Sequence, residues 1–187
     1  PYESFGLMAA GQLDVTSSTV EYGPIAAEEG VPVQMVAYTN PSNGTDKIIL
    51  GPGIESAEDL KGKTVAVLEG GLTQIYMGIW LEENGVAFDE VEYTNLIMDD
   101  AVAAMVSGKV AGGEFWEPFG SNVLKALPDA KVVATSKDPY FVETALLADG
   151  MYMAKPFIED TETAALTLKA YFEAVKFWEE NPEEGNK

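Results

Sequence analysis

Short apolar runs alternate along this chain with longer segments in which apolar residues recur every three to four positions. The run at 64–68, Thr-Val-Ala-Val-Leu, is typical of a buried strand. The segment 72–84 follows it with Ile75, Ile79 and Trp80 on one helical face, and Gly85 marks its end. Repetition of such strand–helix pairs predicts an α/β protein with mostly parallel sheets.

The same patterns predict elements over most of the chain. Helices are expected over 2–10, 19–28, 72–84, 99–107, 118–127 and 157–180, with a short helix from Ser56 that Gly62 ends. Strands are expected over 13–15, 32–38, 47–50, 64–68, 91–95, 110–115, 131–135 and 145–154. A turn at 40–45 and a Gly/Pro-rich crossover at 51–55 interrupt this order.

Two stretches share one order of features: a helix, a glycine turn, a short strand, and then a polar or aromatic ending. They cover residues 7–19 and 100–119. This duplication predicts two similar lobes that face one another.

The complete α/β unit at 54–148 is predicted to form lobe 2. Residues 1–50 plus 151–187 are predicted to form lobe 1, which is incomplete. Crossings near 48–54 and 144–152 would then act as hinges through which the lobes close around a ligand.

Composition excludes several functions. The chain has 31 acidic and 11 basic residues and a formal charge of −20, so nucleic acid and anionic lipid are disfavoured partners. The charge indicates either salt adaptation and a solubilising surface or a preference for a cationic ligand. With no His and no Cys, histidine-based triads, thiol nucleophiles and cysteine-ligated metals are excluded. No phosphate-binding glycine motif occurs either, so we expect binding rather than catalysis, with no catalytic residue, metal or cofactor.

Nothing in the sequence indicates direct membrane insertion. No apolar run reaches the roughly 18 residues that a membrane span needs. No signal peptide is visible, and residue 1 already lies beside a helix, so the N-terminus is expected not to be the natural one.

Several motifs occur in an order shared with one family. They are Gly11-Gln12-Leu13-Asp14-Val15, Glu29-Gly30-Val31-Pro32-Val33, Asp59-Leu60-Lys61-Gly62-Lys63-Thr64-Val65-Ala66-Val67, Ser107-Gly108-Lys109-Val110, Trp116-Glu117-Pro118-Phe119 and Lys169-Ala170-Tyr171-Phe172-Glu173-Ala174. With them the chain resembles, over nearly its whole length, the solute-binding proteins of ABC importers in the sulfonate, taurine, nitrate and thiamine-precursor branch.

The resemblance implies a type II periplasmic-binding-protein fold, with two α/β lobes joined by two hinge crossings. It implies a non-catalytic monomer, periplasmic or a cell-surface lipoprotein, that captures a small solute and docks on an ABC transporter permease. Members of the family are longer, so we expect the chain to be incomplete at both ends. The thiamine-pyrimidine-forming enzyme of yeasts has a similar fold but depends on His and Cys, which are absent here.

The first group of candidate ligand residues lies around the end of the first predicted strand. It consists of Thr16, Ser17, Ser18, Thr19, Glu21 and Tyr22. Hydroxyls and N–H groups between a strand and a helix can bind a ligand. Ser18 and Glu21 could instead form a capping box, and Tyr22 could be a core aromatic. A carboxylate at Glu21 would oppose a sulfonate and favour an amine.

The second group lies at the equivalent corner of the other lobe and consists of Glu69, Gly70, Gly71 and Thr73. Glycine lets a ligand approach the backbone closely, and Thr73 matches a hydroxyl that the family uses. The alternative is a flexible turn in which Thr73 caps the helix and Glu69 is surface charge.

Glu114 and Trp116 complete the candidate set. Their alternation along a strand predicts that both side chains point to one face. Trp116 could line the cleft or pack in the core, and Glu117 could contact ligand or serve as a first-turn acid of the next helix. Together these residues favour an amine-bearing or zwitterionic solute (taurine-like) or a pyrimidine. An alkanesulfonate or nitrate-type anion, or a role as the sensing domain of a regulator, remains the alternative.

Overall fold

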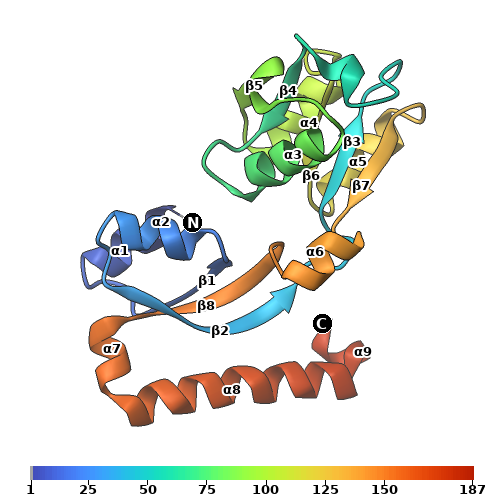
Figure 1. Cartoon of the computed structure of the whole chain (residues 1–187). Coiled ribbons are helices and arrows are strands. Elements are labelled where there is room, and N and C mark those ends of the chain that lie inside the picture. Colours follow the sequence, from blue (N-terminus) through green and yellow to red (C-terminus); the bar gives the residue numbers. More distant parts are fainter. Residues whose placement is uncertain (1) are drawn as a thin grey trace. The chain divides into compact units, whose positions relative to one another are not determined.

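The computed structural model describes residues 2–187, which form two compact units (Figure 1). Unit 1 takes the chain up to residue 18 together with 22–39 and 150–187, and unit 2 takes 19–21 and 40–149. Residues 40–50, expected in lobe 1, therefore lie in unit 2, because β3 (Lys47–Leu50) pairs with strands of the unit 2 sheet. Apart from the short segment 19–21, the chain crosses between units at 39–40 rather than near 48–54, and again at 149–150.

Unit 1 has a three-stranded sheet in the order β1-β8-β2. Its elements are β1 (Val15–Thr19), β2 (Val33–Pro41), β8 (Ala148–Ala154), α1 (Tyr2–Ala9), α2 (Tyr22–Glu28), α7 (Lys155–Glu159), α8 (Thr161–Glu180) and α9 (Pro182–Gly185). Helices α1 and α2 cover one face of the sheet and α8 covers the other (Figure 1). Strand β8 runs antiparallel to β1, because Ala154 N–H donates to Asp14 while Val20 N–H donates to Ala148 at the opposite end.

Unit 2 has a five-stranded sheet in the order β5-β4-β6-β3-β7. Its further strands are β4 (Thr64–Val67), β5 (Glu92–Asn95), β6 (Gly112–Phe115) and β7 (Lys131–Thr135). Its helices are η1 (Glu58–Leu60), α3 (Leu72–Glu83), η2 (Phe88–Glu90), α4 (Met98–Val106), α5 (Phe119–Ala126) and α6 (Pro139–Thr144).

Strand direction differs from the mostly parallel sheets that were predicted. In unit 2, β4 is parallel to β5 and β6, but β3 is antiparallel to β6 and β7. In unit 1, β8 is antiparallel as described above. Both exceptions lie outside the repeating strand–helix order that dictates parallel pairing: β8 lies at a crossing between units, and β3 follows the turn that comes after another crossing.

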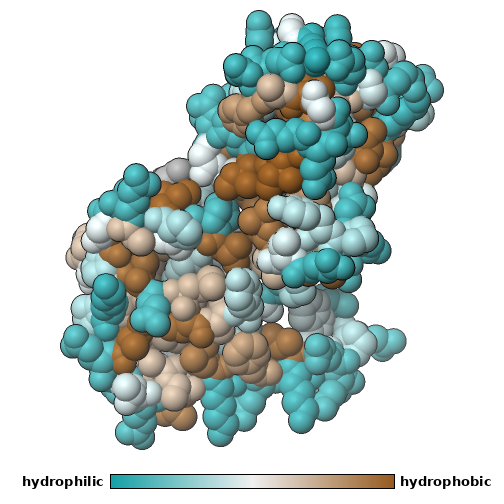
Figure 2. Space-filling model, in the orientation of Figure 1, coloured by the Kyte–Doolittle hydropathy of each residue, from teal (hydrophilic) through white to brown (hydrophobic). Residues whose placement is uncertain are grey.

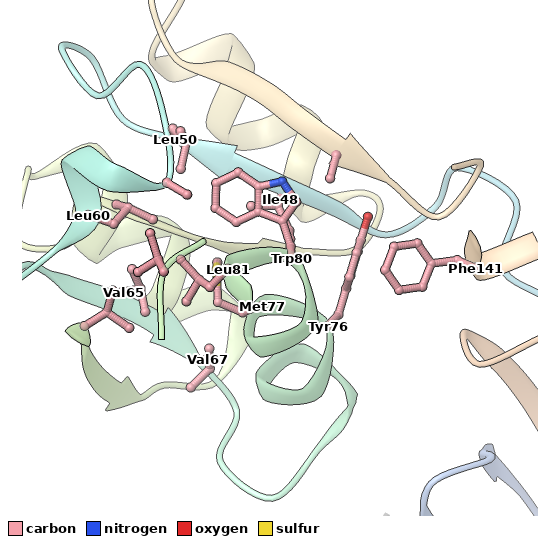
Figure 3. Packing of buried hydrophobic residues seen from close by; sticks show 14 of the residues in the cluster. Ile48, Leu50, Leu60, Val65, Val67, Tyr76, Met77, Trp80, Leu81 and Phe141 are labelled. Carbon is pink, nitrogen blue, oxygen red and sulfur yellow. The ribbon is translucent and has the colours of Figure 1, made fainter. Parts of the chain in front are cut away.

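The core of unit 2 lies on both faces of its sheet. Figure 3 shows α3 presenting Tyr76, Met77, Trp80 and Leu81 to the face that carries Ile48. The opposite face packs against α4 and α5, and Ile49 and Phe115 belong to that second cluster. Ile48 and Ile49 are consecutive and fully buried on opposite faces, as the two-residue period of a strand requires.

Three local predictions need correction. Residues 16–19 form β1 rather than a loop, and α2 begins at Tyr22 rather than 19. The β-branched side chains of Val15, Thr16 and Thr19 favour a strand once β8 is available as a partner. The predicted helix 157–180 is divided into α7 and α8, because Asp160 accepts the N–H of Thr163 at 3.1 Å and begins a new helix.

Candidate functional site in unit 2

The backbone N–H groups of the turn between β4 and α3 are already hydrogen-bonded within the chain. The N–H groups of five consecutive residues each donate within the chain: Leu68 to Thr73 Oγ1, Glu69 to Asn95 Oδ1, Gly70 to Gln74 Oε1, Gly71 to the Leu68 carbonyl, and Leu72 to Glu21 Oε1. Gly70 has a φ of 71°, a conformation that glycine adopts without strain. The turn is therefore a closed hydrogen-bonded structure rather than an open row of donors.

Glu21 lies at the start of α3. Its Oε1 accepts the Leu72 N–H at 3.1 Å and the Thr19 hydroxyl at 2.6 Å. A helix leaves its first N–H groups without helical partners and carries a partial positive charge there, so a carboxylate is stabilised at this position. Glu21 thus supplies an anion from within the chain.

The second oxygen of Glu21 has a different environment. Glu21 is only 9% exposed, and its Oε2 is buried without a hydrogen-bond partner among residues 2–187. Burial raises the pKa of Glu21, hydrogen bonds from Thr19 and from backbone N–H groups oppose that change, and the nearby Asp149 carboxylate raises it slightly further. The start of α3 therefore has a buried carboxylate oxygen, Glu21 Oε2, that lacks a hydrogen-bond donor within the described part of the chain.

The second group of predicted ligand residues, Glu69, Gly70, Gly71 and Thr73, lies in this same turn and at the start of α3. Thr73 is 3% exposed, and its hydroxyl also donates to the Leu68 carbonyl at 3.2 Å. Its hydroxyl thus holds the turn together but does not cap the helix, because the N-cap is Gly71 and Thr73 lies within α3. The side chain of Glu69 is exposed, whereas Gly71 is buried directly before α3.

Glu114 lies in the interior of unit 2, beside Asp46. The two residues are 1% and 8% exposed, and both oxygens of Glu114 are buried. Burial raises the pKa of Glu114 well above its ordinary value, and the charge of Asp46 and a hydrogen bond with it act in the same direction. Since a carboxylate cannot donate, a hydrogen bond between these two acids needs a proton on one of them.

The prediction that Glu114 and Trp116 share a face is wrong. Glu114 is paired with Ile48 across the sheet and therefore lies on the α3 face. Trp116 follows the end of β6 and packs against the opposite cluster, with its ring edge-on to Phe119 at 5.9 Å. The strand period no longer applies because β6 ends at Phe115.

Glu117 has the structural role that was one of its two alternatives. Its carboxylate pairs with Lys47 at 2.7 Å and accepts the N–H of Ser121 at 3.1 Å in the first turn of α5. Lys47 lowers the pKa of Glu117, and its charge also opposes the rise in the pKa of Glu114.

In unit 1, the candidates on β1 are hydrogen-bonded weakly. The Ser17 hydroxyl donates to the Gly150 carbonyl at 3.4 Å and the Thr16 hydroxyl to the Ser17 carbonyl at 3.5 Å. Ser18 is 9% exposed with a buried hydroxyl that has no partner within residues 2–187, so the capping box with Glu21 does not form. Tyr22 is 3% exposed and stacks on Phe5 at 5.7 Å, in agreement with its alternative as a core aromatic.

Sequence reasoning missed three residues that shape these sites. Asn95 and Gln74 close the β4–α3 turn, and Asp46 adjoins Glu114. A signal existed for Asn95, which ends a strand parallel to β4, because the carboxyl ends of parallel strands meet at one sheet edge. Asp46 follows a polar turn, and only its packing against β6 distinguishes it from a surface acid.

Three further features of the described residues concern the surface of unit 2, possible metal ligands and possible membrane-spanning helices. Hydrophilic residues cover the part of unit 2 at the top of Figure 2, as the acidic composition anticipates. Within residues 2–187, no group of three acidic, His or Cys side chains is arranged to hold a metal ion. No helix in the described range is long and apolar enough to span a membrane.

The fold is that of the periplasmic binding proteins. The crystal structure of the periplasmic aliphatic sulphonate binding protein SsuA from Escherichia coli matches with a TM-score of 0.82 at 22% identity, covering 98% of this chain and 58% of that one. Residues 2–185 match the family described as NMT1/THI5 like, and the chain belongs to that family.

Sequence relatives agree with this assignment. The taurine-binding periplasmic protein of Escherichia coli strain K12 is 25% identical over 130 residues, which cover 70% of this chain and 40% of that protein. A protein of Brucella abortus strain 2308, described as a binding protein, is 24% identical over 140 residues, or 75% of this chain and 44% of its own. The chain thus spans less than half the length of these curated relatives.

Proposed function

We propose that this chain is the solute-capturing part of an ABC import system, and that its solute carries hydrogen-bond donors: an amine, a zwitterion such as taurine, or a pyrimidine. The protein acts without catalysis, outside the cytoplasmic membrane in the periplasm or on the cell surface, and delivers its solute to a permease. Support for capture comes from the family and from the relatives described as binding proteins.

The observation that carries the choice of solute is the free acceptor at the start of α3. Glu21 Oε2 is buried and lacks a partner among the described residues, and Asp149 is close enough to raise the pKa of Glu21. No ion pair found within residues 2–187 involves either acid. A ligand ammonium or N–H group would supply the missing partner through a charge-assisted hydrogen bond worth about 1.5–3 kcal/mol.

The alternative solute, a sulfonate or nitrate, is less well supported. An anion needs donors, and the five N–H groups of residues 68–72 already donate within the chain. An anion at this corner would also lie near two carboxylates, which repel it.

A thermal-shift screen of the chain tests the proposal. Taurine, ethanolamine and an aminopyrimidine are compared with methanesulfonate and nitrate at equal ionic strength. A solute present at a hundred times its Kd stabilises the folded state by about 2.7 kcal/mol, or roughly 5–10 °C for a domain of this size. We expect such shifts only from solutes with donors, and stabilisation by the two anions alone would contradict the proposal.

A further inference from the structure

We infer that Glu21 occupies the anion-binding position at the start of α3 with the chain's own carboxylate, and thereby makes this corner select donor-bearing solutes and reject anionic ones. This specificity role rests on the proposed function and adds the residue that decides the class of solute.

The position that Glu21 occupies is one where an external anion would otherwise bind. Helix α3 has 12 residues, and its first N–H, that of Leu72, points at Glu21 Oε1. The N-terminus of a helix of this kind attracts sulfate, phosphate or carboxylate groups. Glu21 reaches it from 51 residues away in sequence, and Thr19 orients the carboxylate by donating to the same oxygen.

The surrounding turn leaves no easy alternative for an anion. Leu68, Glu69, Gly70 and Gly71 all donate their N–H groups to partners within unit 2. A ligand anion that used any of these N–H groups would have to break one of these bonds or displace Glu21, and it would do so beside Asp149, which already acts on Glu21 as a like charge.

What remains for a ligand is the second oxygen of Glu21. It is buried and lacks a partner among the residues described, and its carboxylate cannot rotate freely because Oε1 is held by two donors. Such an oxygen accepts an N–H or ammonium proton but cannot bind another acceptor. The Glu21 side chain thus keeps anions from the start of α3 and accepts hydrogen bonds from donor-bearing solutes.

The test is a gain of function. Glu21→Ala removes the internal anion and frees the Leu72 N–H, whereas Glu82→Ala removes the same charge at an exposed site at the other end of α3. Methanesulfonate binding is measured by calorimetry against sodium chloride of equal ionic strength. We expect Glu21→Ala to bind methanesulfonate at least about tenfold more tightly than the native chain, the equivalent of one charge-assisted hydrogen bond, and Glu82→Ala to match the native chain. Equal affinity in all three proteins would overturn the inference.

A second measurement uses only the native chain, in case Glu21→Ala does not fold. Nuclear magnetic resonance follows the Leu72 amide and the Glu21 side-chain carboxyl carbon during titration with methanesulfonate or methylammonium chloride. We expect methylammonium to shift the Glu21 carboxyl signal and methanesulfonate to leave the Leu72 amide unchanged. A saturable shift of the Leu72 amide with methanesulfonate would show that Glu21 does not exclude anions.

The two proposals can fail separately. If the native chain is stabilised by none of the screened solutes but Glu21→Ala gains methanesulfonate binding, solute capture is wrong and the role of Glu21 stands. If donor-bearing solutes bind but the variant gains nothing, capture stands and the role of Glu21 is wrong.

Discussion

The two buried glutamates of unit 2 have the same side chain in opposite surroundings. Glu21 lies at the start of a helix, where a hydroxyl and a backbone N–H donate to one of its oxygens. Glu114 lies within a sheet whose neighbouring strands use their backbone donors for each other, and another acid, Asp46, lies beside it. Burial raises the pKa of both carboxyls; at Glu21 it is opposed by the Thr19 hydroxyl and backbone N–H groups, whereas at Glu114 the Asp46 charge adds to it and the charge and N–H of Lys47 oppose it.

This comparison separates two uses of a buried acid. At the helix start an ionised carboxylate can be maintained and offered to a ligand, because the helix end supplies the compensating charge. In the sheet interior, burial and the neighbouring Asp46 raise the pKa of Glu114 and so favour its protonated form. Glu114, a predicted ligand residue, is 1% exposed in unit 2.

The largest expected effect comes from the hydrogen bonds that hold Asp46 beside Glu114. Ser136 is fully buried; its hydroxyl oxygen accepts the N–H groups of Gly44 at 2.7 Å and Asp46 at 3.3 Å, and it is hydrogen-bonded to Ser42 Oγ at 2.7 Å. Ser136→Ala leaves these two N–H groups without this acceptor, whereas Ser42 can still donate to Asp46, so we expect the free energy of unfolding to fall by about 3 kcal/mol in urea titrations, with an unchanged m-value.

Ser107→Ala is the matched control for that change. Its hydroxyl donates only to the Ala104 carbonyl at an exposed residue, so a loss below about 0.5 kcal/mol is expected. Similar losses in both variants would show that the Ser136 network does not support the Asp46 segment.

A smaller loss in the free energy of unfolding is expected from a change in the β4–α3 turn. The Thr73 hydroxyl accepts the Leu68 N–H at 2.7 Å and donates to the Leu68 carbonyl, and Thr73→Val removes both bonds while keeping the shape of the side chain. We expect the free energy of unfolding to fall by about 1–2 kcal/mol. Thr144→Val, at an exposed residue whose hydroxyl bonds only the Tyr140 carbonyl, should change it by less than about 0.5 kcal/mol. If the two valine variants were equally stable, the turn would not depend on Thr73.

The smallest effect, and one of opposite sign, is expected for Glu114→Gln. Because the pKa of Glu114 is higher in the folded state than in the unfolded chain, the folded state binds more protons, and native stability falls as pH rises through the interval between the two pKa values. Glutamine needs no proton and can donate to Asp46, so this contribution disappears. We expect the variant to be more stable than the native chain by about 1 kcal/mol at pH 9, with the difference vanishing near pH 4.

Thermal unfolding between pH 4 and pH 9 measures that difference. Glu82→Gln, which changes the same charge at an exposed position, should follow the native pH profile. A Glu114→Gln curve parallel to the native one would mean that Glu114 is ionised in the folded protein and is stabilised by a hydrogen-bond donor or a cation.

Several elements could be predicted because their signals are local. The strands at 47–50 and 131–135 have the predicted bounds, and the helix predicted at 72–84 ends one residue earlier, at Glu83. These segments have an apolar period or a breaker such as Gly85 that acts within a few residues. Residues 16–19 carried no such signal, because their strand conformation depends on pairing with β8, which is more than a hundred residues away.

The candidate site was predictable in its residue types but not in their arrangement. Both Glu21 and the residues of the β4–α3 turn were expected near a ligand, yet they were assigned to different lobes, whereas the structure places 19–21 within unit 2. The alternation of Glu114 and Trp116 failed because the strand ends between them.

By itself, the sequence determined the acidic charge, the absence of histidine and cysteine chemistry, most of the helices and strands, and the motifs that place the chain in its family. Only the tertiary structure decided which acid lies beside hydrogen-bond donors and which is buried beside another acid. The physical reason is that a carboxyl group's state depends on the few atoms around it, and at Glu21 the decisive one belongs to Leu72, 51 residues further along the chain.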